Sequence, residues 1–247
     1  MNEYNRGEIM KLIDVSKHNG VIDWKKVAAD GIDGAIIRAG YGKSAGQIDI
    51  KFVENYSGAR AAGLKVGVYW YSYAVTAAEA RAEAAACLKV LNGRAVDFPV
   101  YFDMEEKTHA KMSVEKCDEI ATAFCECIER AGYWAGIYSF DSFYASNWSQ
   151  DMPKRFAAWV ARIPSNDNGV NKVDPKCCKV YGIHQYSWKG KVAGINGDVD
   201  LNDCKIDYPA LINKNGGVDV TATIKGVTAA KAAEIRRACE ALGMTVV

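Results

Sequence analysis

The stretch VGVYWYSYAVTAAEARAEAAACLKVLNGRAVDFPVYFD, residues 66–103, contains a complete strand–helix–strand unit. Its first six and its last five residues are apolar runs of the length expected for buried strands. Between them, Thr76 can cap a helix because Glu79 stands three residues further on, as in a capping box. An Ala-rich helical pattern follows. Two strands joined through a helix pair in parallel by a right-handed crossover, so this stretch predicts a parallel α/β sheet.

The same alternation extends along the chain in both directions. Strands are predicted at residues 11–15, 35–39, 66–71, 99–103, 134–139, 156–160, 181–186 and 198–201, and helices at 24–30, 52–62, 76–91 and 113–131. Residues 141–155 and 162–179 carry Pro, Asn, Asp and Gly without a helical period. Eight strands, of which only the first four or five are followed by good helices, predict a closed α/β barrel that has lost its last helices. An open doubly wound sheet is the alternative, although no Gly-x-Gly-x-x-Gly or Walker loop follows the first strand.

The composition narrows the classes of function. The 247 residues are 49% hydrophobic and 25% charged, as in an ordinary globular protein. A net charge of +1 gives no electrostatic reason to expect a nucleic acid or an anionic membrane as partner. No apolar run approaches the roughly 18–20 residues of a membrane span, so we expect no membrane insertion. Residues 1–10 lack the apolar stretch of a signal peptide, so we expect synthesis in the cytoplasm.

Cysteine and histidine give no sign of a metal site. The eight cysteines form no Cys-x-x-Cys pair, and none of the three histidines stands at ligand spacing to a cysteine pair. We therefore expect reduced, mostly buried thiols and no bound metal.

Acidic side chains follow several predicted strands at their carboxyl ends, where α/β barrels carry their function. Asp14 ends the first strand, Asp103 ends the fourth, and Asp200 belongs to the last. Glu105 follows Asp103 by two residues, and on a strand two such side chains point to the same side. Apolar surroundings and a neighbouring like charge raise the pKa of one carboxyl of such a pair. A protonated acid beside an ionised one is what cleavage of a glycosidic bond needs, although a magnesium site or a solvated turn would also explain the pair.

Aromatic and polar side chains gather near the same strand ends. The candidates for substrate contacts are Arg38, Tyr41, Tyr69, Tyr71, Tyr138, Trp159 and Gln185. Sugar rings present apolar faces that stack on aromatic planes, while their hydroxyls need polar partners. The alternative is that these aromatic rings fill the barrel and its interface with the helices.

Several segments together resemble the glycoside hydrolase family 25 lysozymes, which are N-acetylmuramidases. The resemblance rests on IDVSKHNGVIDW at 13–24, AIIRAGYG at 35–42, GVYW at 67–70, Asp103-x-Glu105, GIYS at 136–139, Trp159, QYS at 185–187 and GINGDVDLN at 194–202. It covers roughly residues 10–207, in order along the chain.

The resemblance implies an irregular TIM-like barrel with five β/α units followed by three further strands. It implies a phage endolysin or bacterial autolysin that cleaves the β-1,4 bond between N-acetylmuramic acid and N-acetylglucosamine in the peptidoglycan of the cell wall. By motif, Glu105 is the general acid/base, Asp103 assists at the sugar centre, and Asp14 and Asp200 are two further acids of the site. Retention through the substrate's 2-acetamido group is expected, with a protein nucleophile as the alternative. This chemistry needs no cofactor.

Two positions leave the match to the family pattern open, and two other functions are alternatives to a muramidase. His184 stands where the family often has Trp, and Asp198 is a second candidate for the role of Asp200. A chitinase-like hydrolase would carry a longer run of Asp before the Glu, whereas residues 99–102 are Pro-Val-Tyr-Phe. A non-catalytic glycan-binding barrel would be favoured by the loss of Asp103 or Glu105, and both are present.

The segment after residue 207 has a different pattern. Strands are predicted at 219–226 and 244–247, and a helix at 228–243. Such a βαβ unit is too small to bury its own faces. We therefore expect a catalytic barrel over residues 1–207 and a C-terminal segment, 208–247, that mediates homo-oligomer formation or wall attachment, or that packs on the barrel as a flap.

Overall fold

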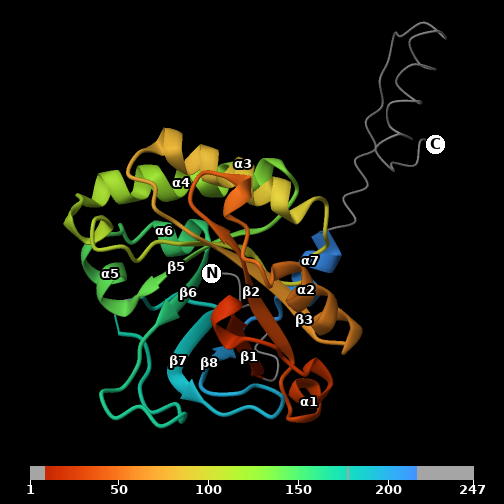
Figure 1. The fold of residues 1–247 in the computed structure, drawn as a ribbon. Helices are drawn as coiled ribbons and strands as arrows, with labels where there is room; N and C mark the ends of the chain where they lie inside the picture. The colour runs from red at the N-terminus through yellow and green to blue at the C-terminus, as the bar shows by residue number, and fades with distance from the viewer. Residues whose placement is uncertain (1–8, 177, 216–247) are drawn as a thin grey trace, which may run out of the picture. The chain divides into compact units, whose positions relative to one another are not determined.

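The computed structural model describes residues 9–176 and 178–215, whose eight strands close into one barrel in sequence order (Figure 1). The strands are β1 (Met10–Val15), β2 (Gly34–Tyr41), β3 (Lys65–Tyr71), β4 (Val100–Asp103), β5 (Ala135–Phe140), β6 (Ala157–Ala161), β7 (Ile183–Gly190) and β8 (Val199–Cys204). The longer helices are α2 (Phe52–Ala61), α3 (Ala77–Leu91), α4 (Val114–Arg130) and α7 (Tyr208–Asn215). The short ones are α1 (Trp24–Ala29), α5 (Asp141–Ser146), α6 (Met152–Arg155), η1 (Lys17–Asn19), η2 (Ala45–Gln47) and η3 (His109–Lys111). The predicted closed barrel is confirmed, and the open doubly wound sheet is excluded.

One strand of the barrel, β8, runs in the direction opposite to the other seven. Strands β1 to β7 pair in parallel with their neighbours, whereas β8 is antiparallel to both β7 and β1. The chain passes from β7 to β8 without a helix, because antiparallel neighbours need no crossover connection. The antiparallel closure places Asp200, near the start of β8, opposite Asp14, near the end of β1.

The expectation that residues 141–155 contain no helix is wrong. Helices α5 and α6 lie there, with six and four residues. A hydrophobic period is best recognised in a window of about 11 residues or more, and the Pro, Asn and Asp of this segment favour a loop over a short helix. Pro153, in the first turn of α6, is in a position that starts a helix rather than breaking one.

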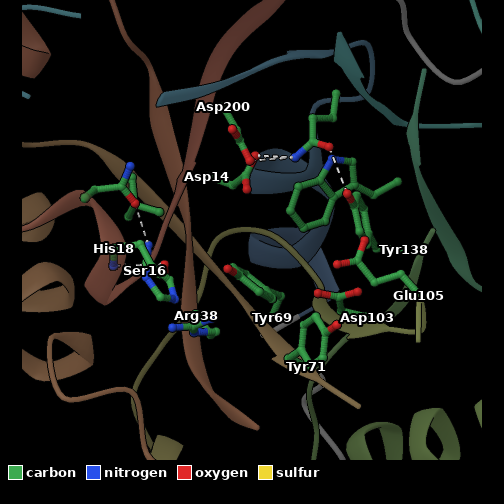
Figure 2. Close-up of a pocket in the computed structure, with 14 residues that line it drawn as sticks. Asp14, Ser16, His18, Arg38, Tyr69, Tyr71, Asp103, Glu105, Tyr138 and Asp200 are labelled. Carbon is green, nitrogen blue, oxygen red and sulfur yellow. Dashed lines mark hydrogen bonds between the residues drawn. The ribbon is translucent and has the colours of Figure 1, made fainter. Parts of the chain in front are cut away.

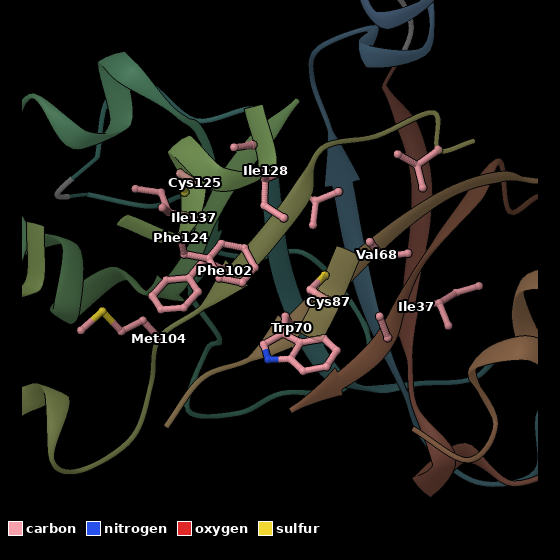
Figure 3. Packing of buried hydrophobic residues seen from close by; sticks show 14 of the residues in the cluster. Ile37, Val68, Trp70, Cys87, Phe102, Met104, Phe124, Cys125, Ile128 and Ile137 are labelled. Atoms are coloured by element: carbon pink, nitrogen blue, oxygen red, sulfur yellow. The ribbon is translucent and has the colours of Figure 1, made fainter. Parts of the chain in front are cut away.

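Alternation of side chains along the strands separates two layers of apolar residues. In β4, Tyr101 packs inside the barrel with Trp159, and Phe102 points outward to the helices. The ring centroids of Phe102 and Phe124 of α4 lie 4.6 Å apart, and Figure 3 shows this contact among other buried residues of the outer layer. Asp103, the next residue, is therefore directed inward at the carboxyl end of the barrel.

The amino end of the barrel is covered by α7. Tyr208 is buried, and its ring contacts those of Phe98 and Trp134, each with a centroid distance of 6.4 Å. The expected boundary after residue 207 thus falls immediately before a helix that packs on the barrel. Residues 216–247, and with them the predicted βαβ unit, lie outside the described residues.

Two further features concern the described residues only. No helix among them is long and apolar enough to cross a membrane. Their cysteines, Cys87, Cys117, Cys125, Cys127, Cys178 and Cys204, are free thiols.

Candidate active site

A pocket of about 270 Å³ opens at the carboxyl ends of the parallel strands (Figure 2). It is lined by Asp14, Val15, Ser16, His18, Asn19, Arg38, Tyr69, Tyr71, Asp103, Glu105, Tyr138, Trp159, Gln185 and Asp200. Alternation along the strands brings these side chains together, because two residues that are two apart on one strand, such as Tyr69 and Tyr71, point to the same side. Segments far apart in the sequence thus contribute to one cavity.

The structure places nearly all the candidate residues in this pocket. Tyr41 is the exception among them, because it lines an adjoining pocket. Asp198, the alternative to Asp200, does not line the pocket and forms an ion pair at 2.6 Å with Lys191. His184 is buried, and its Nε2 lies 3.1 Å from the carbonyl oxygen of Arg162, as expected of a satisfied strand histidine.

Residues just after β1 line the pocket although they were not among the candidates. Ser16 caps η1 and accepts a hydrogen bond from the backbone of His18, which turns the chain across the pocket mouth. Asn19 completes the cap by accepting a hydrogen bond from the backbone of Ser16. Their position after a predicted strand end, inside the IDVSKHNGVIDW segment, was the signal that could have identified them.

A network of amides fixes the Asp14 carboxylate. Its Oδ2 accepts hydrogen bonds from Gln185 Nε2 at 2.9 Å and from Asn202 Nδ2 at 2.8 Å. Tyr138 and Trp159 in turn donate to the oxygens of these amides, each at 2.8 Å. Burial raises the pKa of Asp14, and the two amide hydrogen bonds act in the opposite direction. Asn202, which lies in the GINGDVDLN segment but was not among the predicted site residues, helps to hold this carboxyl in place.

Asp103 is buried at the floor of the pocket. Its Oδ1 has no hydrogen-bond partner among the described residues. Burial, and after it the charge of Glu105, raises the pKa of Asp103 well above its usual value, whereas the charge of Arg38 lowers it. In the free protein the surroundings therefore favour a proton on this carboxyl.

The other acids of the pocket have raised pKa values as well. Burial, followed by the charges of Asp14 and Glu106, raises the pKa of Glu105 to about 7. Burial and the neighbouring Asp14 raise the pKa of Asp200 to about 9. Carboxyl groups this close cannot all ionise at neutral pH, so they share protons as a coupled set. The pocket thus holds available protons at neutral pH.

The backbone around Glu105 is held from two sides. Ser139 Oγ donates to the carbonyl of Met104 at 2.7 Å. The backbone N–H of Glu106 donates to His109 Nδ1 at 3.2 Å, so the ring proton lies on Nε2, which donates to the carbonyl of Ala74 at 3.0 Å. His109 therefore ties the segment after β4 to the segment after β3.

The chain matches known proteins over most of the barrel. The sequence model of the glycosyl hydrolases family 25 matches residues 13–195. The autolytic lysozyme of Clostridium acetobutylicum is 28% identical over 194 residues, which are 78% of this chain and 55% of that protein. The uncharacterized protein YegX of Escherichia coli K12 is 30% identical over 199 residues, covering 77% of this chain and 67% of that protein.

A solved structure also matches this chain over most of the barrel. The modular autolysin LytC from Streptococcus pneumoniae, whose structure is also known in complex with a synthetic peptidoglycan ligand, matches with a TM-score of 0.67 and 26% identity. The match covers 79% of this chain and 46% of LytC. The chain thus spans about half the length of the autolytic lysozyme and of LytC.

Proposed function

This chain belongs to the family 25 glycosyl hydrolases, and from that premise we propose that it is a muramidase acting on bacterial cell walls. The reaction is hydrolysis of the β-1,4 bond between N-acetylmuramic acid and N-acetylglucosamine in peptidoglycan. The observation that carries the proposal is that Asp103 and Glu105 line one pocket, in surroundings that raise the pKa of both carboxyls.

Glu105 is the general acid in this proposal. With a pKa raised to about 7, a large fraction of its carboxyl is protonated at neutral pH. It donates this proton to the glycosidic oxygen as the bond to the anomeric carbon breaks, and its carboxylate then takes a proton from the attacking water. In this proposal Asp14, whose carboxyl accepts two amide hydrogen bonds, stabilises the positive charge that develops on the sugar, and Asp200, with a pKa raised to about 9, shares a proton with it.

Asp103 orients the substrate's 2-acetamido group. The unpartnered Oδ1 is an acceptor that suits the acetamido N–H, and a protonated carboxyl retains one such acceptor oxygen. Held in this way, the acetamido oxygen can attack the anomeric carbon while the leaving sugar departs with the proton from Glu105. Water then opens the resulting ring, and the configuration is retained.

The test is clearance of a suspension of bacterial walls by the chain and by Glu105→Gln. We expect the variant to be slower by about 10²–10⁴-fold, the usual contribution of general acid–base catalysis. Glu126→Gln is the matched control, because Glu126 is an exposed residue of α4 outside the pocket. Clearance by Glu105→Gln at the rate of the parent would remove Glu105 from this role.

The products distinguish the proposed bond from other possibilities. Mass spectrometry of digested peptidoglycan should find muramic acid at the new reducing ends. Glucosamine at these ends would mean cleavage of the neighbouring bond. Faster cleavage of chitooligosaccharides than of peptidoglycan would favour the chitinase-like alternative.

A further inference from the structure

A second pocket of about 270 Å³ adjoins the acidic one. It is lined by Lys17, His18, Arg38, Tyr41, Tyr71 and Tyr73, which come from the ends of β1, β2 and β3 and the residues just after them. His18, Arg38 and Tyr71 line both pockets, so the two cavities are direct neighbours. In the view of Figure 2, His18 and Arg38 lie on the opposite side of the acidic pocket from Glu105.

The charge of this second pocket comes from Lys17. The Arg38 guanidinium is balanced by the buried Asp49, with 2.7 Å between Nε and Oδ2. Lys17 is exposed and forms no ion pair within residues 9–176 and 178–215. Two lysines after β2, Lys43 and Lys51, are instead paired, with Glu79 at 3.2 Å and with Glu54 at 2.7 Å. An uncompensated ammonium group therefore lies at this pocket.

Hydrogen-bond donors and aromatic rings complete the pocket. His18 lines the same pocket as Lys17, and its imidazole offers a ring N–H as donor. Tyr73 is half exposed, and its ring lies 5.3 Å from that of Tyr71 and 6.4 Å from that of Tyr41, centroid to centroid. These groups suit a ligand with an anionic part and an apolar part.

Two hydrogen bonds hold the backbone of the segment that carries Tyr73. The backbone N–H of Tyr73 donates to the buried carboxyl of Glu83 on α3 at 2.9 Å. The carbonyl of the following residue, Ala74, accepts the hydrogen bond from His109. The ring is therefore presented on a held backbone, which lowers the conformational cost of binding.

The two pockets differ in their ionisable groups. The first contains four carboxyl groups, which share protons, and its one Lys or Arg side chain, Arg38, is balanced by Asp49, so it offers an anionic substituent no free cation. In the substrate proposed above, every muramic acid carries a lactyl group that ends in a carboxylate or is extended by a stem peptide with its own carboxylates. Such a substituent needs a place outside the acidic pocket but next to it.

We propose that the pocket of Lys17, His18 and Tyr73 binds the carboxylate-bearing substituent of a muramic acid residue, and so selects substituted over unsubstituted glycan. This inference rests on the proposed function and deepens it. The carboxylate comes either from the lactyl group itself or from the stem peptide, and both are recognised by the same ammonium and imidazole donors.

The test measures binding calorimetrically with the full chain carrying Glu105→Gln, which prevents turnover. Three ligands of equal glycan length are compared: peptidoglycan oligosaccharides with stem peptides, the same oligosaccharides with free lactyl carboxylates, and chitooligosaccharides without carboxylates. Lys17→Met, added to this background, should bind carboxylate-bearing ligands about five- to tenfold more weakly, as expected for the loss of one partly exposed charged hydrogen bond. Its binding of chitooligosaccharides should not change.

The control is Lys65→Met, which removes an exposed lysine at the start of β3, at the other end of the barrel. It should bind all three ligands like the parent. The side chain of Lys17 forms no hydrogen bond among the described residues, so Lys17→Met should unfold at the same temperature as the parent. A loss confined to the peptide-bearing ligand would assign the carboxylate to the stem peptide, and a loss confined to the ligand with free lactyl groups would assign it to the lactyl carboxylate, which is an amide in the peptide-bearing ligand. Equal losses with both would mean that the pocket accepts either carboxylate.

Unchanged binding of the muramyl ligands by Lys17→Met would overturn the inference, as would an equal loss for chitooligosaccharides. Either result could stand beside normal wall hydrolysis by the parent, and the proposed function would then survive. A parent that neither hydrolyses walls nor binds any of the three ligands would contradict the proposed function, and this inference with it.

Discussion

Glu105 lies partly buried near Asp14 and Glu106, and these surroundings raise its pKa to about 7. Asp103, two residues before it, is more deeply buried, and the charge of Glu105 raises its pKa further. The two carboxyls are thus not equivalent, although the sequence places them as a simple pair. The depth of burial and the neighbouring charges decide which of the two carboxyls can exchange a proton near neutral pH.

The first prediction at this scale concerns pH. Glu105 must be protonated to act as an acid, and a carboxyl with a pKa of about 7 loses its proton as the pH rises through that value. We therefore expect kcat/KM for glycan hydrolysis to fall about tenfold per pH unit above 7. Initial rates between pH 5 and pH 9 measure this, with unfolding followed over the same range as a control. A rate that stays constant from pH 6 to pH 9 would contradict it.

A second prediction compares two aspartates near the start of β8. Asp200 lines the pocket opposite Asp14, whereas Asp198 pairs with Lys191 at the surface. Asp200→Asn should lower the rate of wall hydrolysis by up to about 10²-fold, because the groups around Asp14 would shift. Asp198→Asn should leave the rate near that of the parent. Similar rates for the two variants would show that Asp200 has no special role.

At the scale of elements, the strands are held in register by close packing inside the barrel. Gly136 of β5 is one such position, because a Cβ there would lie 2.4 Å from the ring of Tyr101 and 2.9 Å from the carbonyl oxygen of Ala157. Tyr101 is itself fully buried and cannot move aside freely. The GIYS segment therefore needs a glycine at its first position for a steric reason.

The corresponding prediction is that Gly136→Ala lowers the free energy of unfolding by about 1–3 kcal/mol, the usual cost of overpacking a core. Urea unfolding measures this change. Gly46→Ala is the control, since a Cβ at Gly46 would meet the Ser44 hydroxyl at 3.4 Å, and its effect should stay within about 0.5 kcal/mol. Equal stability of the two variants would mean that the barrel interior adjusts without cost.

At the scale of the whole molecule, the segment after α7 adds 32 residues to the catalytic barrel. We propose that residues 216–247 mediate self-association or attachment to the wall. Light scattering tests the first possibility by comparing the full chain with a chain that ends at residue 215. The cut belongs there and not at residue 207, because Tyr208 packs against Phe98 and Trp134. Removing a buried aromatic side chain costs about 3–5 kcal/mol.

The expected result is a larger mass for the full chain and a single-chain mass for the shortened one. A pull-down with purified walls tests attachment in the same pair of proteins. Identical monomer masses together with identical wall binding would exclude both roles. Hydrolysis of a small glycan should be equal in the two chains, because the described barrel contains every residue of the candidate site.

The sequence by itself predicted the order of the eight strands, the helices α1 to α4, and the position of Asp14, Arg38 and Asp103 near the carboxyl ends of their strands. These follow from periods of 2 and 3.6 residues, which are local properties that a single sequence displays. Helices α5 and α6 were not predicted because they are short and lie in a segment with Pro, Asn and Asp, and α7 was not predicted either.

Only the tertiary structure decided how distant residues meet. The antiparallel closure by β8 sets Asp200 against Asp14, and Gln185 and Asn202 meet at Asp14 although they lie more than 170 residues from it along the chain. The separation of Tyr41 from the acidic pocket, the unpaired state of Lys17 and the raised pKa values have the same origin. Each depends on distances through space and on burial, and these quantities do not exist until the barrel is closed.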